Sequence, residues 1–149
     1  MTERAVLGTA AVVLPLRQPL LVAKSAATVD VLSGGRFVLG LASGDRPVEH
    51  PLFGEDFQGR GATFRRGVEI LRAAWARHTD GAGMELPELG LDAGRRLDVL
   101  PKPTGTSVPL AIAGHAQQSA EWISRNAGAS LNYPRPRWVR KGSKRNGSF

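Results

Sequence analysis

The sequence predicts an α/β protein built around a parallel β-sheet. Short apolar runs of strand length alternate along the chain with segments of helical spacing, and glycines lie close to the ends of the runs. Such alternation is typical of parallel strands joined by right-handed helical crossovers. The 149 residues correspond to about one ordinary domain, and no apolar run has the length of a membrane-spanning helix.

Four apolar runs are predicted as strands, and they cover residues 5–14, 36–42, 109–113 and 129–133. The first run is continuous, which favours a strand that is covered on both faces, as in parallel sheets. Residues 97–100 could add a short edge strand to the same sheet.

Helical spacing predicts three helices, over residues 20–32, 63–77 and 117–127. Gly34 follows the first of them and suits the left-handed conformation that often ends a helix. Residues 48–61 contain proline and glycine without a clear period, so we expect a long loop there. Four apolar side chains of the second helix form one stripe that should face the core: Phe64, Val68, Leu71 and Trp75.

Charge is distributed unevenly along the chain, whose formal net charge is +7. Residues 135–149 hold six of the 20 Lys and Arg and no acid, which leaves 14 basic against 13 acidic residues, or +1, for the rest. We therefore expect a folded domain over residues 1–134 and a basic, disordered tail over 135–149. An alternative function follows from this tail, in which its cations and Trp138 bind nucleic acid or another partner. The nearly neutral remainder of the chain disfavours that alternative.

Several classes of site are excluded by composition. The chain has no Cys, so it has no disulfide, no thiolate zinc site and no cysteine nucleophile. It also lacks a Rossmann glycine pattern, a P-loop, metal-spaced histidines and a serine-hydrolase elbow. The apolar start of the chain loosely resembles a signal peptide, but Glu3 and Thr9 interrupt that pattern, and a cytoplasmic location without a membrane segment is expected.

Functional groups in parallel sheets gather at the carboxyl ends of the strands. These ends are predicted at residues 15–17, 43–46, 114–118 and 133–135. The loop from Gly114 to Ser119 leads into a helix, so it could hold a phosphate on free backbone N–H groups or could simply cap the helix. Arg46 could likewise bind an anion or form a solvated ion pair.

Three collinear strings at these positions resemble the luciferase-like monooxygenase family of flavin-dependent (β/α)8 barrels. They are residues 7–47, 50–75 and 100–135, and LSGGRFVLGLASGDRP followed by FGEDF is the most specific part. Within these strings, the segment GDRPVEHPLFG resembles a bacterial luciferase-type oxidoreductase subgroup. The resemblance implies a partial (β/α)8 TIM barrel that runs from the third to the sixth strand and is truncated at both ends. It leaves sheet edges open, from which we expect self-association.

The same resemblance implies a flavin-dependent oxidoreductase or monooxygenase, here a fragment whose activity alone is in question. Its cofactor would be FMN, or alternatively a deazaflavin, and it would act on a small molecule that the sequence does not identify. No catalytic residue and no metal ligand is assigned. By resemblance, one strand segment with a non-proline cis peptide, one loop near the flavin and one phosphate loop form the cofactor site: Thr9, Ala10, Ala11; Ser43, Gly44, Asp45; Gly114, His115 and Ser119.

Overall fold

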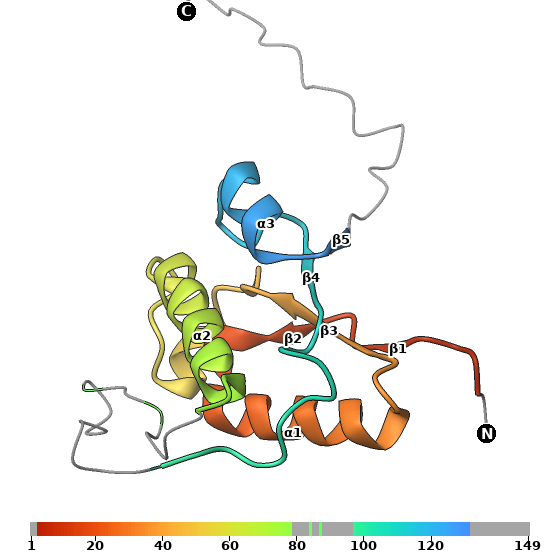
Figure 1. The fold of residues 1–149 in the computed structure, drawn as a ribbon. Helices are drawn as coiled ribbons and strands as arrows, with labels where there is room; N and C mark the ends of the chain where they lie inside the picture. Colours follow the sequence, from red (N-terminus) through yellow and green to blue (C-terminus); the bar gives the residue numbers. More distant parts are fainter. Residues whose placement is uncertain (1–2, 79–83, 85–86, 88–96, 132–149) are drawn as a thin grey trace, which may run out of the picture.

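The computed structural model describes residues 3–78, 84, 87 and 97–131. Its centre is a parallel sheet in which helices connect all successive strands except the first two, and this confirms the predicted α/β class (Figure 1). The sheet order is β1-β3-β4-β5, and β2 also pairs with β3. The strand bounds are Leu7–Gly8 for β1, Val12–Val13 for β2, Phe37–Ala42 for β3, Leu110–Ala113 for β4 and Ala129–Leu131 for β5.

The prediction of one continuous strand over residues 5–14 is wrong. Gly8 pairs with Val38 and Val12 pairs with Leu41, so four steps along the first segment match only three along β3. Between these pairs the Thr9 side chain replaces the regular ladder. Its Oγ1 accepts a hydrogen bond from the Gly40 backbone N–H at 2.9 Å and donates one to the Gly40 carbonyl at 3.0 Å. The apolar run therefore forms two short strands, β1 exposed and β2 half-buried.

The first two helices agree closely with the predictions. Helix α1 (Pro19–Ser33) ends at Gly34, which has the expected left-handed conformation with a φ of 68°. Helix α2 (Arg60–Trp75) begins three residues before the predicted start at residue 63. The predicted loop before α2 contains a short 3-10 helix, His50–Phe53.

Helix α3 (Ala120–Asn126) begins three residues later than predicted. Ala116 and Gln117 have positive φ values of 46° and 59°, which a helix does not accommodate. The chain therefore turns before the helix, and the Ser119 side chain accepts a hydrogen bond from the Trp122 backbone N–H as an N-cap.

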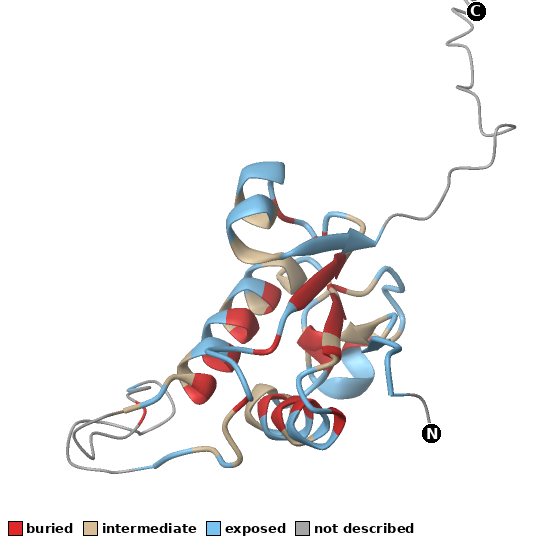
Figure 2. Cartoon of the chain, turned by 45° about the vertical axis from the view of Figure 1, so that its right-hand side comes forward, coloured by how far each residue is buried: buried red, intermediate tan, exposed pale blue. Residues whose placement is uncertain are grey.

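The core lies between the sheet and the helices α1 and α2, which pack side by side (Figure 1). The large side chains of β3 alternate along the strand and face these helices: Phe37, Leu39 and Leu41. Figure 2 shows the matching buried surfaces on the helices. The predicted stripe of α2 is confirmed, because each of its four side chains is at most 1% exposed.

The opposite face of the sheet carries smaller residues. They alternate with the core residues and are Val38, Gly40 and Ala42 from β3, and Ala111 and Ala113 from β4. Small side chains leave open space on this face near the carboxyl ends of the strands.

Three remaining expectations concern the rest of the chain. Residues 97–100 do not form the suggested edge strand. The predicted tail over 135–149, its boundary at residue 134 and the strand end at 133–135 lie outside the described residues. Within the described residues, none of the helices is long and apolar enough to cross a membrane.

Candidate functional site

A pocket of about 400 Å³ lies where β2, β3 and β4 end at their carboxyl edge. Six of the nine predicted cofactor residues line it, although they come from three separate segments. These six are Ala11, Ser43, Gly44, Asp45, Gly114 and His115. Parallel pairing of the strands brings the segments together, because equivalent ends of parallel strands meet at one edge.

The segment from Thr9 to Ala11 reaches the pocket only with Ala11. The Ala10–Ala11 peptide bond is cis, as the resemblance implies. Thr9 is instead bonded to Gly40 and lines a different groove of about 390 Å³, between the edge of the sheet and α1. Ala10 is not among the residues that line the pocket.

The loop after β3 packs closely against the side chain of His50. Gly44 has a φ of 81°, and a Cβ at this position would lie 2.8 Å from His50 Nε2 and 2.9 Å from Val13 Cγ1. Glycine is required here both for the left-handed backbone and for this close contact. Ser43 is buried, whereas Asp45 is exposed at the pocket. His50 itself is fully buried, with neither ring nitrogen bonded to a described residue.

In the loop after β4, only some of the backbone N–H groups that could hold a phosphate lack a partner among the described residues. The Gly114 N–H donates to the Leu131 carbonyl at 2.8 Å, and the Gln118 N–H donates to the His115 carbonyl at 2.7 Å. No described residue accepts a hydrogen bond from the N–H of His115 or Ala116. A Cβ at Gly114, whose φ is 61°, would meet no atom within 4 Å, so the space beside this residue is open.

Ser119 lies outside the pocket lining and acts as the N-cap of α3. The simpler of the two hypotheses for this residue, a helix cap, is therefore confirmed by the geometry. Its hydroxyl oxygen accepts from the Trp122 N–H at 3.2 Å, which leaves the hydroxyl hydrogen available to another acceptor. A role in phosphate binding stays a prediction.

The sequence directed attention to Arg46, but the pocket cation is Arg60. Arg46 is exposed and pairs with Glu49 at 3.1 Å, which is the solvated ion pair of the simpler interpretation. Arg60 lines the pocket from the first turn of α2. Its Nη1 donates to the Phe57 carbonyl at 2.6 Å, its guanidinium lies 3.7 Å from the centre of the Phe57 ring, and its buried Nε has no partner among the described residues. Sequence reasoning missed Arg60 because it placed residues 48–61 in a loop.

Comparison with known proteins assigns the fold and the family. The family model for luciferase-like monooxygenases matches residues 1–134. The chain belongs to this family.

Two solved structures and one curated relative illustrate the similarity. A monooxygenase of Streptomyces bottropensis, RslO1, is 27% identical with a TM-score of 0.69, over 87% of this chain and 39% of that one. A diketocamphane monooxygenase of Pseudomonas putida, solved in complex with FMN, shares the fold at 21% identity and a TM-score of 0.61, over 84% and 38% of the two chains. A Mycobacterium tuberculosis protein, provisionally named a coenzyme F420-dependent oxidoreductase, is 30% identical over 125 residues, which are 79% of this chain and 36% of that one.

The chain thus spans less than half the length of these relatives. Members of the luciferase-like family are oxidoreductases and monooxygenases, and the parallel sheet with its helices corresponds to part of their α/β barrel. The pocket of this chain therefore lies at the barrel edge where such folds hold their ligands.

No group of three or more His, Asp or Glu side chains in the described residues could hold a metal ion. Three features could hold an anionic cofactor: the Arg60 guanidinium, the backbone N–H groups of His115 and Ala116, which have no acceptor among the described residues, and the open space beside Gly114. They suit the phosphate end of a flavin, because charge-assisted hydrogen bonds and backbone donors are what phosphate groups bind in proteins.

Proposed function

We propose that this chain carries the phosphate-binding part of a flavin site in an oxidoreductase of the luciferase-like family. FMN is one candidate cofactor and the deazaflavin F420 is the other, since each is named with a relative or structural neighbour. The observation that carries the proposal is the pocket in which Arg60 and the loops after β3 and β4 converge.

The residues present fit such a cofactor at its phosphate end. Arg60 would donate from its unpartnered Nε to a phosphate oxygen, and the N–H groups of His115 and Ala116 would add backbone donors. Gly114 leaves room for the phosphate to approach the loop. Thr9, Ala10 and Ser119 lie outside the pocket lining, so their proposed contacts with the cofactor are less direct than those of the other six residues.

The cofactor, when bound, would supply the redox chemistry, by hydride transfer or by reaction with oxygen. The chain's own residues would bind and orient it. Ala11, just before β2, and Ala42, at the end of β3, have small side chains and line the pocket, so a flat ring system can lie against the sheet there. The substrate stays unassigned.

A titration with FMN and with riboflavin, which lacks the phosphate, tests this proposal. Arg60→Gln should weaken FMN binding about tenfold or more, since a hydrogen bond to a charged group contributes roughly 1.5–3 kcal/mol. Riboflavin binding should change little. Arg46→Gln is the matched control, because Arg46 is an exposed arginine that does not line the pocket.

Two outcomes would contradict the proposal. One is wild-type protein that binds neither flavin at high micromolar concentration. The other is an equal loss of FMN and riboflavin affinity in Arg60→Gln, which would place Arg60 in a purely structural role beside Phe57. Arg60→Lys separates these roles further, because it keeps the charge but loses the planar guanidinium that stacks on the ring.

Self-association through the sheet edges is also proposed. Within the described residues β1 and β5 each pair with a single neighbour, and Leu7 and Leu131 are 42% and 37% exposed at these edges. Sedimentation across a range of concentrations should show a dimer or larger species, and Leu7→Lys should shift it toward monomer. A concentration-independent monomer would contradict this.

A cytoplasmic location stays a prediction, which cell fractionation can test. The nucleic-acid alternative finds no support in the family match.

A further inference from the structure

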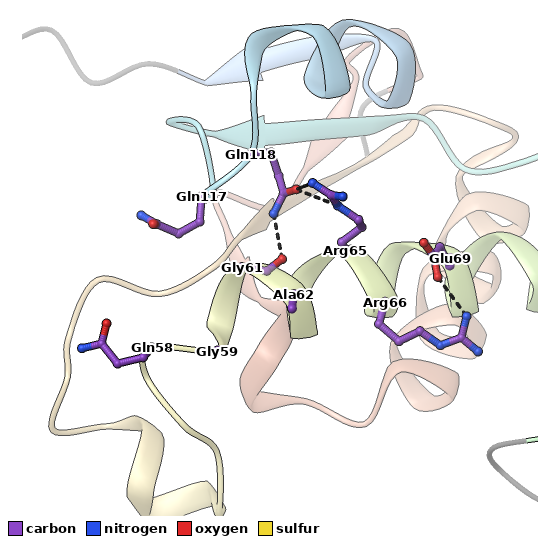
Figure 3. Close-up of a pocket in the computed structure, with 9 residues that line it drawn as sticks. All are labelled: Gln58, Gly59, Gly61, Ala62, Arg65, Arg66, Glu69, Gln117 and Gln118. Atoms are coloured by element: carbon purple, nitrogen blue, oxygen red, sulfur yellow. Dashed lines mark hydrogen bonds and ion pairs between the residues drawn. The ribbon is translucent and has the colours of Figure 1, made fainter.

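A second groove, of about 490 Å³, adjoins the first pocket (Figure 3). Gln117 lines both cavities, so a ligand that leaves the first pocket past this residue enters the second. One wall is formed by the first turns of α2 and the other by the loop between β4 and α3. Both walls come from neighbouring elements of this chain.

The two walls are fastened together by Gln118, whose side chain is buried. Its Nε2 donates to the carbonyls of Gly61 at 2.8 Å and Ala116 at 3.1 Å. Its Oε1 accepts from Arg65 Nε at 3.1 Å and Nη2 at 2.9 Å, as the dashed lines in Figure 3 show. Gly61 permits this close packing, because a Cβ there would lie 2.8 Å from Gln117 Cβ. The groove is therefore a fixed feature of the fold.

Residues that line the groove carry several donors without a partner among the described residues. The Nη1 of Arg65 and the side-chain amides of Gln58 and Gln117 make no hydrogen bond to a described residue. In Figure 3 both amides lie at the end of the groove away from the Arg66–Glu69 ion pair, whose atoms are 2.9 Å apart. With that pair neutral, Arg65 gives the groove a net positive charge. Guanidinium and amide donors of this kind suit carboxylates.

We propose that this groove binds an acidic arm that extends from the cofactor beyond its phosphate, and that it favours the deazaflavin F420 over FMN. This inference rests on the proposed function. FMN ends at its phosphate, whereas F420 continues from its phosphate into a chain of glutamates. Gln117 lines both cavities and follows His115 and Ala116, whose N–H groups are proposed above to bind the phosphate. The carboxylates of the arm then lie along Gln58 and Arg65.

The experiment measures the affinity of the whole chain for three ligands: F420, F420 trimmed of its glutamates, and FMN. Wild type should bind complete F420 roughly fivefold more tightly than the trimmed form, as expected for a few exposed ion pairs. High salt should reduce this preference, because exposed charges are screened. Gln58→Glu places a like charge in the groove and should abolish the preference, while affinity for trimmed F420 and FMN stays unchanged.

Arg65→Gln should give the same loss of preference, but it also removes a hydrogen-bond partner of Gln118. Gln58→Glu is free of that complication, since the Gln58 side chain makes no hydrogen bond or ion pair with a described residue. Arg125→Gln is the control, because Arg125 is an exposed arginine of α3 that pairs with Glu121 and does not line the groove.

Equal affinity of wild type for complete and trimmed F420 would overturn the inference but leave the proposed function intact, provided that trimmed F420 or FMN binds. If none of the three ligands binds, both fail. Free tri-γ-glutamate that binds as tightly as complete F420 would also overturn it, because the groove would then be a site for acidic peptides independent of the cofactor.

Discussion

Gly40→Ala should be the most damaging small substitution in the sheet. A Cβ at Gly40 would lie 1.9 Å from the Thr9 carbonyl oxygen, where real Cβ atoms keep at least 3.0 Å. The Thr9 backbone must therefore move by about 1.1 Å, the difference of these two distances. Such a movement breaks both hydrogen bonds between the Thr9 hydroxyl and the Gly40 backbone.

The magnitude follows from these two effects. Overpacking costs about 1–3 kcal/mol and the two hydrogen bonds about 1 kcal/mol each, so the free energy of unfolding should fall by about 3–5 kcal/mol. The melting temperature should then fall by roughly 10 °C. Because Ala11 lies two residues beyond Thr9 and lines the pocket, flavin affinity should fall as well.

Urea denaturation followed by circular dichroism measures the change, and Gly8→Ala is its matched control. Gly8 lies in β1, opposite the same strand, but its added Cβ would make only an ordinary 3.4 Å contact with the Val38 carbonyl oxygen. The control should change stability by less than about 1 kcal/mol. If the free energies of unfolding of the two variants differ by less than about 1 kcal/mol, the close approach of Thr9 and Gly40 does not determine the stability of this part of the sheet.

Two further predictions concern polar contacts. Thr104→Val should lower the free energy of unfolding by about 1.5–3 kcal/mol, because the Thr104 hydroxyl donates at 2.7 Å to the buried Asp30 carboxylate. In the same urea titration, Thr106→Val at an exposed position should be nearly neutral. Equal losses of stability in the two variants would show that the hydrogen bond to Asp30 is not the cause. Ser119→Ala should destabilise α3 by about 1 kcal/mol through loss of the cap to Trp122. Ser119→Asn should restore most of it in amide hydrogen exchange, and an Asn variant as frayed as the Ala variant would show that the cap is not the cause.

The sequence pattern was sufficient for the elements that burial determines. α1, α2 and β3 carry long apolar patterns whose period matches their structure, and their predicted extents differ from the observed ones by at most a few residues. The break within residues 5–14 was not predictable in this way. An apolar pattern reports burial, whereas this break depends on a hydrogen bond between Thr9 and Gly40, residues that are distant in sequence.

In the candidate site, too, local sequence patterns predict some features, whereas others depend on contacts between distant residues. Its loops follow apolar strands and could be located by topology alone. The late start of α3 depends on positive φ angles at Ala116 and Gln117, for which neither residue type gives a signal. Arg60 was assigned to the loop over residues 48–61. Even in a helix its place at the pocket depends on the position of α2 relative to the sheet, and no local pattern encodes a packing relation between distant elements.

The alternation of side-chain size along β3 connects the core to the site. Phe37, Leu39 and Leu41 face the helices, while Gly40 and Ala42 face the other way. Large residues are needed on the first face, because two helices must be held against the sheet by apolar burial. Small residues are needed on the second, because Ala42 lines the pocket and a larger side chain would occupy the space of the ligand. One strand therefore meets both demands through its period of two, and the same sequence pattern that builds the core also leaves the pocket open.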